Sequence, residues 1–115
     1  MRIELLYFDG CPSYAAFLPR LRALLADEGV DAEVELRRVE TSEAAEGERF
    51  LGSPTLRIEG ADVDPGAADR TDYGFKCRLY RTDAGTAHVP PDDWVRAALE
   101  RVRGASEERG DGDAL

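Results

Sequence analysis

The chain has 115 residues, of which 43% are hydrophobic, which is enough for one compact domain with a core and too little for two ordinary domains. Its 24 acidic residues outnumber 15 basic residues and give a formal net charge of −9, so a phosphate backbone or an anionic membrane would repel it. We therefore expect neither nucleic acid nor a membrane as a partner.

The N-terminal segment predicts a buried strand. Residues 2–8 are mostly apolar, as in a strand that is covered on both faces, and the run ends at Asp9 and Gly10. This apolar run of about six residues is too short for a signal-peptide core or a membrane span. Two cysteines without a secretion signal do not indicate a structural disulfide framework, so we expect a cytoplasmic protein.

A helix and a second strand should follow. Pro12 suits the first turn of a helix over residues 12–28, and Gly29 would end it. Four apolar residues share one face of that helix: Phe17, Leu21, Leu24 and Leu25. Pro19 inside it predicts a kink. Residues 30–40 alternate as a strand does, and the helical connection predicts that this strand is parallel to the first.

The middle of the chain predicts shorter elements. They are, in order, a helix over residues 42–50 capped by Thr41 or Ser42, a strand over 55–59, a tight reversal at Gly60-Ala61, a return through Val63, an irregular loop over 65–74 and an extended segment over 75–81. Gly47 weakens the first of these. Aspartates at positions 62 and 64 are interpreted as turn-forming and solubilising residues.

The last predicted helix begins near Pro91 and ends at Gly104. Its expected buried residues are Trp94, Val95, Ala98, Leu99 and Val102. Residues 104–115 are charged and poor in apolar side chains, so we expect a disordered acidic tail after a domain over 1–103. The predicted fold is α/β, in the order β-α-β-α-β-β-α with a loop insertion before the last helix.

Cys11 lies between the first strand and its helix, which is a favourable place for a reactive thiol. The first turn of a helix offers free N–H groups and the positive end of the helix dipole to a sulfur anion. A buried cysteine of the core rarely needs a helix-starting proline directly after it, and here Pro12 follows Cys11. We therefore predict that Cys11 is the nucleophile of a thiol reaction.

The element order, the Cys-Pro at residues 11–12 and the Ser-Pro-Thr at residues 53–55 resemble the thioredoxin-like fold. The resemblance implies that Pro54 is a cis-proline facing Cys11. It also implies that the backbone of Ser53 is exposed beside the sulfur, where an extended thiol or disulfide substrate would pair with it. Ser53, Pro54 and Tyr14 are thus the expected substrate-binding residues, and no cofactor is expected.

The motif "CPSY" departs from the Cys-x-x-Cys of that family, because Tyr14 stands where the second cysteine would be. Exchange between two cysteines one helical turn apart is thereby excluded. Tyr14 could donate a hydrogen bond to the thiolate, or it could be a packing residue. Cys77 is the remaining candidate for a resolving thiol, and burial as a small apolar residue is its alternative role.

Longer stretches, "LLYFDGCPSY", "FLGSPTLRIEGADVDPG" and "DYGFKCRLY", are similar to bacterial thioredoxin-like proteins, some of them selenoproteins and some labelled alkylmercury-lyase-like. The lyase label implies a different chemistry, in which Cys11 and Cys77 bind mercury and an acid such as Asp9 protonates the leaving carbon. A third alternative is a non-catalytic interaction module. The substrate and the oligomeric state stay open at this point.

Overall fold

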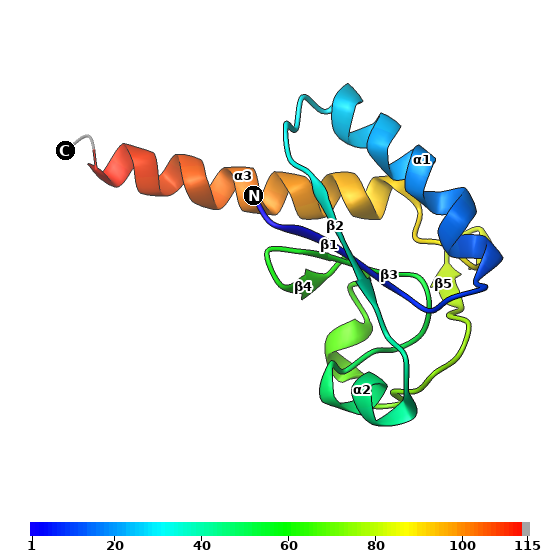
Figure 1. Ribbon diagram of the computed structural model, residues 1–115. Coiled ribbons are helices and arrows are strands. Elements are labelled where there is room, and N and C mark those ends of the chain that lie inside the picture. The colour runs from blue at the N-terminus through cyan, green and yellow to red at the C-terminus, as the bar shows by residue number, and fades with distance from the viewer. Residues whose placement is uncertain (114–115) are drawn as a thin grey trace.

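The computed structural model describes the backbone of residues 1–113 and the side chains of residues 1–104. The elements of the described residues follow one another along the chain as drawn in Figure 1. They are β1 (Ile3–Tyr7), α1 (Pro12–Asp27), β2 (Val34–Arg38), α2 (Ser42–Gly47), β3 (Thr55–Ile58), β4 (Ala61–Asp62), the 3₁₀ turn η1 (Ala67–Asp69), β5 (Tyr80–Thr82), β6 (Gly85–Ala87) and α3 (Asp92–Asp113). The predicted α/β class is confirmed.

A mixed four-stranded sheet in the order β2-β1-β3-β4 forms the centre of the fold. As predicted, β2 is parallel to β1, with Ile3 opposite Val34. Strand β3 lies antiparallel on the other side of β1. Because Ile58 pairs with Ala61, the turn consists of Glu59 and Gly60, whose φ angles are 53° and 82°. The predicted reversal at Gly60-Ala61 is therefore one residue too late.

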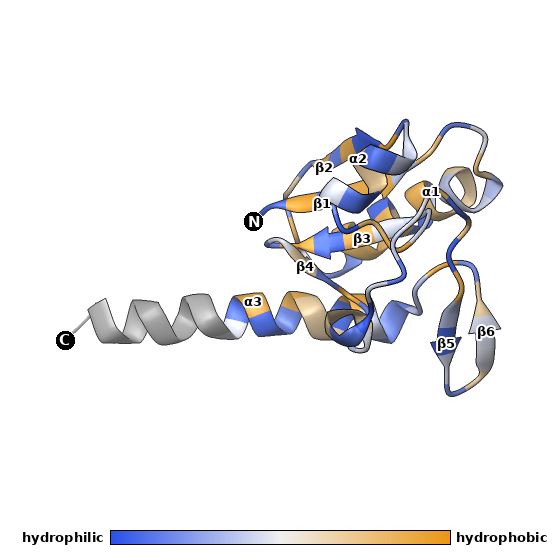
Figure 2. Cartoon of the chain, turned by 90° about the horizontal axis from the view of Figure 1, so that it is seen from below, coloured by the Kyte–Doolittle hydropathy of each residue, from blue (hydrophilic) through white to orange (hydrophobic). Residues whose placement is uncertain are grey.

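Two apolar clusters cover the two faces of this sheet. The larger cluster joins β1 and β3 to α1 and α3, and its buried members include Ile3, Leu5, Phe17, Leu21, Leu56, Ile58, Val95 and Leu99. The smaller cluster joins Leu6 of β1 to Val39, Ala45 and Phe50 around α2. Figure 2 shows α2 and α3 on opposite sides of the sheet. Leu5 and Leu6 point to opposite faces of the sheet, so β1 is covered on both faces and the sheet is the middle layer between α2 on one side and α1 and α3 on the other.

The edges of the sheet differ from its centre. On β2, side chains are exposed or half-buried, and three of its five residues are charged: Glu35, Arg37 and Arg38. The other edge strand, β4, has only two residues. In the middle of the sheet β1 carries a buried carboxylate, Glu4, which accepts hydrogen bonds from Arg37 at 2.8 Å and from Arg2 at 3.1 Å.

All three predicted helices are present where the sequence places them, but their observed last residues differ from the predicted ones. Helix α1 stops one residue before the predicted Glu28 and contains Pro19. Helix α2 is capped by Thr41, whose Oγ1 accepts the Ala44 N–H at 3.0 Å, and it ends at Gly47. The backbone of α3 stays helical beyond Gly104, so the predicted end there is wrong. Side chains from residue 105 on, and residues 114–115 altogether, lie outside the described part, so the disorder expected for residues 104–115 stays a prediction.

The segment before α3 contains a hairpin, so the prediction of a simple loop insertion is wrong. Strands β5 and β6 pair antiparallel in a separate two-stranded sheet. Each has only three residues, which is too short for an alternating pattern to be recognised. Among the described residues, none of the helices is both long enough and apolar enough to cross a bilayer.

Candidate functional site

Cys11 begins the first helix, as its position before Pro12 predicts. It is the N-cap residue of α1, and its Sγ accepts the backbone N–H of Tyr14 at 3.4 Å. Its own N–H donates to the carbonyl of Phe8 at 3.3 Å. The residue is only 3% exposed. The sulfur therefore occupies the place of a capping oxygen, where a helix N-terminus stabilises negative charge.

Tyr14 contributes its backbone to this arrangement, while its side chain packs elsewhere. Its ring stacks on that of Tyr7, with the centroids 3.9 Å apart and the planes 10° from parallel. Burial raises the pKa of Tyr14, and the neighbouring Tyr7 raises it further. The geometry thus gives Tyr14 a packing role, together with a backbone hydrogen bond to the sulfur of Cys11.

Ser53 and Pro54 lie close to the turn that leads from β1 to Cys11. The peptide bond between them is cis, and both residues are buried. The Ser53 Oγ accepts the N–H of Phe8 at 3.4 Å. Because the carbonyl of Phe8 in turn accepts the Cys11 N–H, a short chain of hydrogen bonds connects the Ser53–Pro54 turn to the start of α1.

Cys77 lies beside Ser53, a placement that the sequence alone leaves open. The Ser53 N–H donates to the carbonyl of Lys76 at 2.9 Å, and the Arg78 N–H donates to the carbonyl of Ser53 at 3.0 Å. These two bonds make Cys77 the residue paired with Ser53 in a parallel bridge. Cys77 is exposed, which excludes the alternative of a buried apolar residue.

This pairing corrects two expectations. The backbone groups of Ser53 are not exposed, since residues 76 and 78 of the same chain occupy both of them. The extended segment predicted over residues 75–81 is a regular strand only from Tyr80 on, and it pairs with β6 rather than with the central sheet. Before Tyr80, its one ladder contact is the bridge at Cys77.

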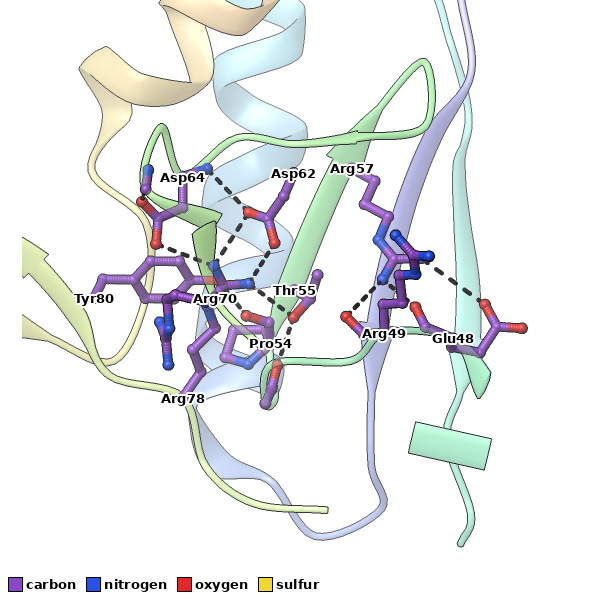
Figure 3. Close-up of polar contacts among 12 residues, drawn as sticks. Glu48, Arg49, Pro54, Thr55, Arg57, Asp62, Asp64, Arg70, Arg78 and Tyr80 are labelled. Atoms are coloured by element: carbon purple, nitrogen blue, oxygen red, sulfur yellow. Dashed lines mark hydrogen bonds and ion pairs between the residues drawn. The ribbon is translucent and has the colours of Figure 1, made fainter. Parts of the chain in front are cut away.

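A buried arginine that is not among the predicted site residues holds this segment in place. The side chain of Arg78 is 0% exposed. Its Nη1 donates to Thr55 Oγ1 at 3.0 Å and to Asp62 Oδ2 at 2.7 Å, and its Nη2 donates to Asp62 Oδ1 at 3.2 Å and to Asp64 Oδ2 at 3.1 Å (Figure 3). The guanidinium carbon also lies 4.4 Å from the centre of the Tyr80 ring.

The network continues to the Ser53–Pro54 turn. The Tyr80 hydroxyl donates to the carbonyl of Pro54, and Thr55 Oγ1 donates to the carbonyl of Gly52 at 2.6 Å. Burial lowers the pKa of Arg78, but its interactions with Tyr80, Asp62 and Asp64 together outweigh this effect, so its net pKa is raised. Burial raises the pKa of Tyr80 far above its ordinary value. The charged guanidinium of Arg78, through Thr55, and the neutral phenol of Tyr80, through the Pro54 carbonyl, therefore stabilise the Ser53–Pro54 turn.

The aspartates of this network have two functions. Asp62 Oδ1 accepts the Asp64 N–H at 2.9 Å, and Asp64 Oδ1 accepts the Gly66 N–H at 2.8 Å, which is the predicted turn chemistry. Both also neutralise Arg78, a role that their interpretation as turn-forming and solubilising residues did not include. The sequence held one hint, because Arg78 lies two residues before the aromatic Tyr80 and so on the same side of an extended chain.

An open hollow of about 740 Å³ lies beside Cys77. Its lining is apolar at Leu51, Leu79 and Trp94 and charged at Arg70, Asp72 and Arg81, among others. Cys77 belongs to this lining, whereas Cys11 does not. The two thiols thus differ in access, since Cys77 faces an open surface and Cys11 is enclosed.

Asp9, the acid named for the lyase alternative, points to solvent. Its carboxylate is 82% exposed and forms an ion pair with Arg38 at 3.2 Å. In the part of the chain that the structure describes, His, Cys, Asp and Glu side chains form no group of three that could hold a metal ion. No protein-family model, curated protein or solved structure matches this chain.

Proposed function

We propose that this chain is a thiol-dependent redox protein with a thioredoxin-like fold, in which Cys11 and Cys77 act together on a thiol or disulfide substrate. The observation that carries the proposal is the position of Ser53 between the two cysteines. Its hydroxyl contacts the turn that leads to Cys11, and its backbone pairs with Cys77. The sheet order β2-β1-β3-β4, with β3 antiparallel, supports the fold assignment.

Cys11 is the nucleophile of the proposed reaction. Its thiolate, stabilised by the Tyr14 N–H, attacks one sulfur of a disulfide, forms a mixed disulfide and releases the other half as a thiolate. The thiolate of Cys77 then attacks the Cys11 sulfur and releases the second half. The substrate gains two electrons, the protein is left with a Cys11–Cys77 disulfide, and an external thiol must reduce it again.

A hydroperoxide would follow the same scheme. The Cys11 thiolate attacks the terminal oxygen, the O–O bond breaks, and an alcohol leaves while Cys11 becomes a sulfenic acid. The Cys77 thiol then displaces water and forms the same disulfide. Both cysteines are free thiols in the structure, which suits the reducing cytoplasm in which we place the protein.

The organomercurial alternative has less support from the geometry. It requires a carboxylic acid near the sulfurs, and the carboxylate of Asp9 instead pairs with Arg38 on the surface. The redox reaction needs only the two thiols and an external reductant. We therefore place the redox function first.

Mild oxidation of the full chain tests this function. One equivalent of a small disulfide should produce a Cys11–Cys77 linkage, identified as a linked peptide by mass spectrometry. A disulfide requires Cα atoms within about 7 Å, so the linkage also measures how close the two residues come. Cys77→Ser should instead accumulate the mixed disulfide on Cys11. Native protein that leaves the two peptides unlinked would exclude Cys77 from the reaction.

A further inference from the structure

We propose that residues 75–78, here called the pairing segment, act as a built-in substitute for a substrate strand at Ser53. Cys11 then reacts with small disulfides or hydroperoxides and not with an extended polypeptide held at this edge. The inference rests on the proposed function, because it names the class of substrate for the same thiol. It starts from a specific contact, namely the occupation of both Ser53 backbone groups by the chain itself.

An extended peptide binds to a protein edge through free N–H and C=O groups. At Ser53 the N–H is bonded to Lys76 and the C=O is bonded to Arg78, at 2.9 Å and 3.0 Å. The pairing is parallel and centred on Cys77. A polypeptide could therefore pair with Ser53 only after displacing residues that are covalently attached and already in place.

The pairing segment is fixed at its C-terminal end. The guanidinium of Arg78 is buried among Thr55, Asp62 and Asp64 (Figure 3). The backbone of Arg78 also packs directly on Gly52, where a Cβ atom would lie 2.9 Å from the Arg78 Cα. Displacement of this end would expose or unpair a buried charge, so the pairing should persist in solution.

The N-terminal end is held by weaker contacts. The ring of Phe75 lies 4.8 Å from that of Phe8, at an angle of 36°. The Lys76 Nζ donates to the Asp72 carbonyl at 2.6 Å and to its Oδ2 at 3.0 Å. Hydrogen bonds from Arg70 and then from Lys76 lower the pKa of Asp72, so this anchor is charged at neutral pH. The segment is thus attached on both sides of Cys77.

Access to the sulfur agrees with small substrates. Cys11 is only 3% exposed, so a reagent that reacts with its sulfur must be small, and a polypeptide strand lying along the surface would not reach it. Attack on a small disulfide transfers one half to Cys11 and releases the other half as a thiolate.

The test uses the full chain with Cys77→Ser, so that Cys11 is the single thiol. Two probes carry the same 2-thiopyridyl leaving group, one on mercaptoethanol and one on the central cysteine of an eight-residue extended peptide. Absorbance of the released thiopyridone gives both rates. We expect the ratio of small-probe rate to peptide rate to exceed the ratio for glutathione, a free thiol, by at least about tenfold. A ratio equal to that of glutathione would overturn the proposal.

Variants locate the effect. Phe75→Ala and Arg78→Met should each lower the rate ratio toward that of glutathione, because they loosen opposite ends of the pairing segment. Leu79→Ala is the control, since it removes another exposed apolar side chain just outside the segment. If Arg78→Met does not fold, Phe75→Ala decides, because Phe75 is 45% exposed and its loss should leave the fold intact. An unchanged ratio in Phe75→Ala would contradict the role of the segment.

Amide hydrogen exchange separates this inference from the function on which it rests. The N–H groups of Ser53 and Arg78 should exchange slowly in the native chain, whether or not Cys11 is reactive. Fast exchange at both would overturn the pairing. If Cys11 reacts with neither probe while both amides are protected, the pairing holds, and the proposed function and its substrate class are refuted.

Discussion

Replacement of the buried Arg78 by methionine should lower the free energy of unfolding by about 3–5 kcal/mol, the usual cost of removing one partner of a buried ion pair. Its guanidinium is 0% exposed, and the carboxylates that it contacts are 14% exposed at Asp62 and 10% exposed at Asp64. Methionine fills a similar space without donors. The two carboxylates would keep only backbone N–H partners, from Asp64 and Gly66, against their shared negative charge.

Urea unfolding followed by circular dichroism measures this loss. Arg81→Met is the matched control, because Arg81 is exposed and the same change there should stay within about 0.5 kcal/mol. In a background with Asp62→Asn and Asp64→Asn, Arg78→Met should cost less, since no unpaired charge remains. If Arg78→Met in the native background lowers the free energy of unfolding by less than about 1 kcal/mol, as an exposed substitution would, the view that this network stabilises the fold is refuted.

Three further predictions concern the same region. Gly52→Ala should destabilise the chain by about 1–3 kcal/mol more than Gly29→Ala, because both have positive φ but only Gly52 meets backbone, at 2.9 Å; urea unfolding of both variants compares them. A bulky thiol reagent such as a fluorescein maleimide should modify the exposed Cys77 at least about tenfold faster than the buried Cys11, and a peptide mass-spectrometric time course with equal rates would contradict the burial of Cys11. Burial raises the pKa of Tyr80, so its contribution to stability should be complete below about pH 10 and lost as the pH rises toward the folded-state pKa. Tyr80→Phe should flatten this alkaline decline in unfolding experiments at several pH values, and an unchanged slope would exclude Tyr80 as its cause.

The sequence predicts the regular elements of this fold well because their signals are local. The spacing of Phe17, Leu21, Leu24 and Leu25 identifies the buried face of α1, and Pro12 marks its beginning. The helical connection is enough to predict that β1 and β2 are parallel. The position of Cys11 at the start of α1 is predicted on the same basis, since its neighbours in sequence are also its neighbours at the helix start.

Contacts between distant segments leave no such local signal. The pairing of Ser53 with Cys77 joins residues 24 positions apart through the backbone, which has no sequence pattern of its own. The burial of Arg78 depends on two aspartates on the other side of an irregular loop. A charged residue in a short extended segment is ordinarily interpreted as exposed, and only the folded arrangement shows its partners.

Glu4 illustrates the same limit within a correctly predicted strand. The apolar pattern around it predicts a buried strand, and a buried carboxylate there is unfavourable unless it is paired. Its partner Arg37 lies on β2, where the parallel register brings it close, and the hydrogen bond to Glu4 raises the pKa of Arg37. The cost of burying Glu4 is thus offset by a residue 33 positions later.

The edges of the central sheet also affect how the chain behaves at high concentration. A long, flat and apolar edge strand invites a second molecule to add its own strand, which is the first step of many aggregates. Here one edge, β2, carries Glu35, Arg37 and Arg38, and the other edge, β4, consists of two residues. A second copy would meet charged side chains at one edge and almost no ladder at the other, so edge-to-edge association is disfavoured on both sides.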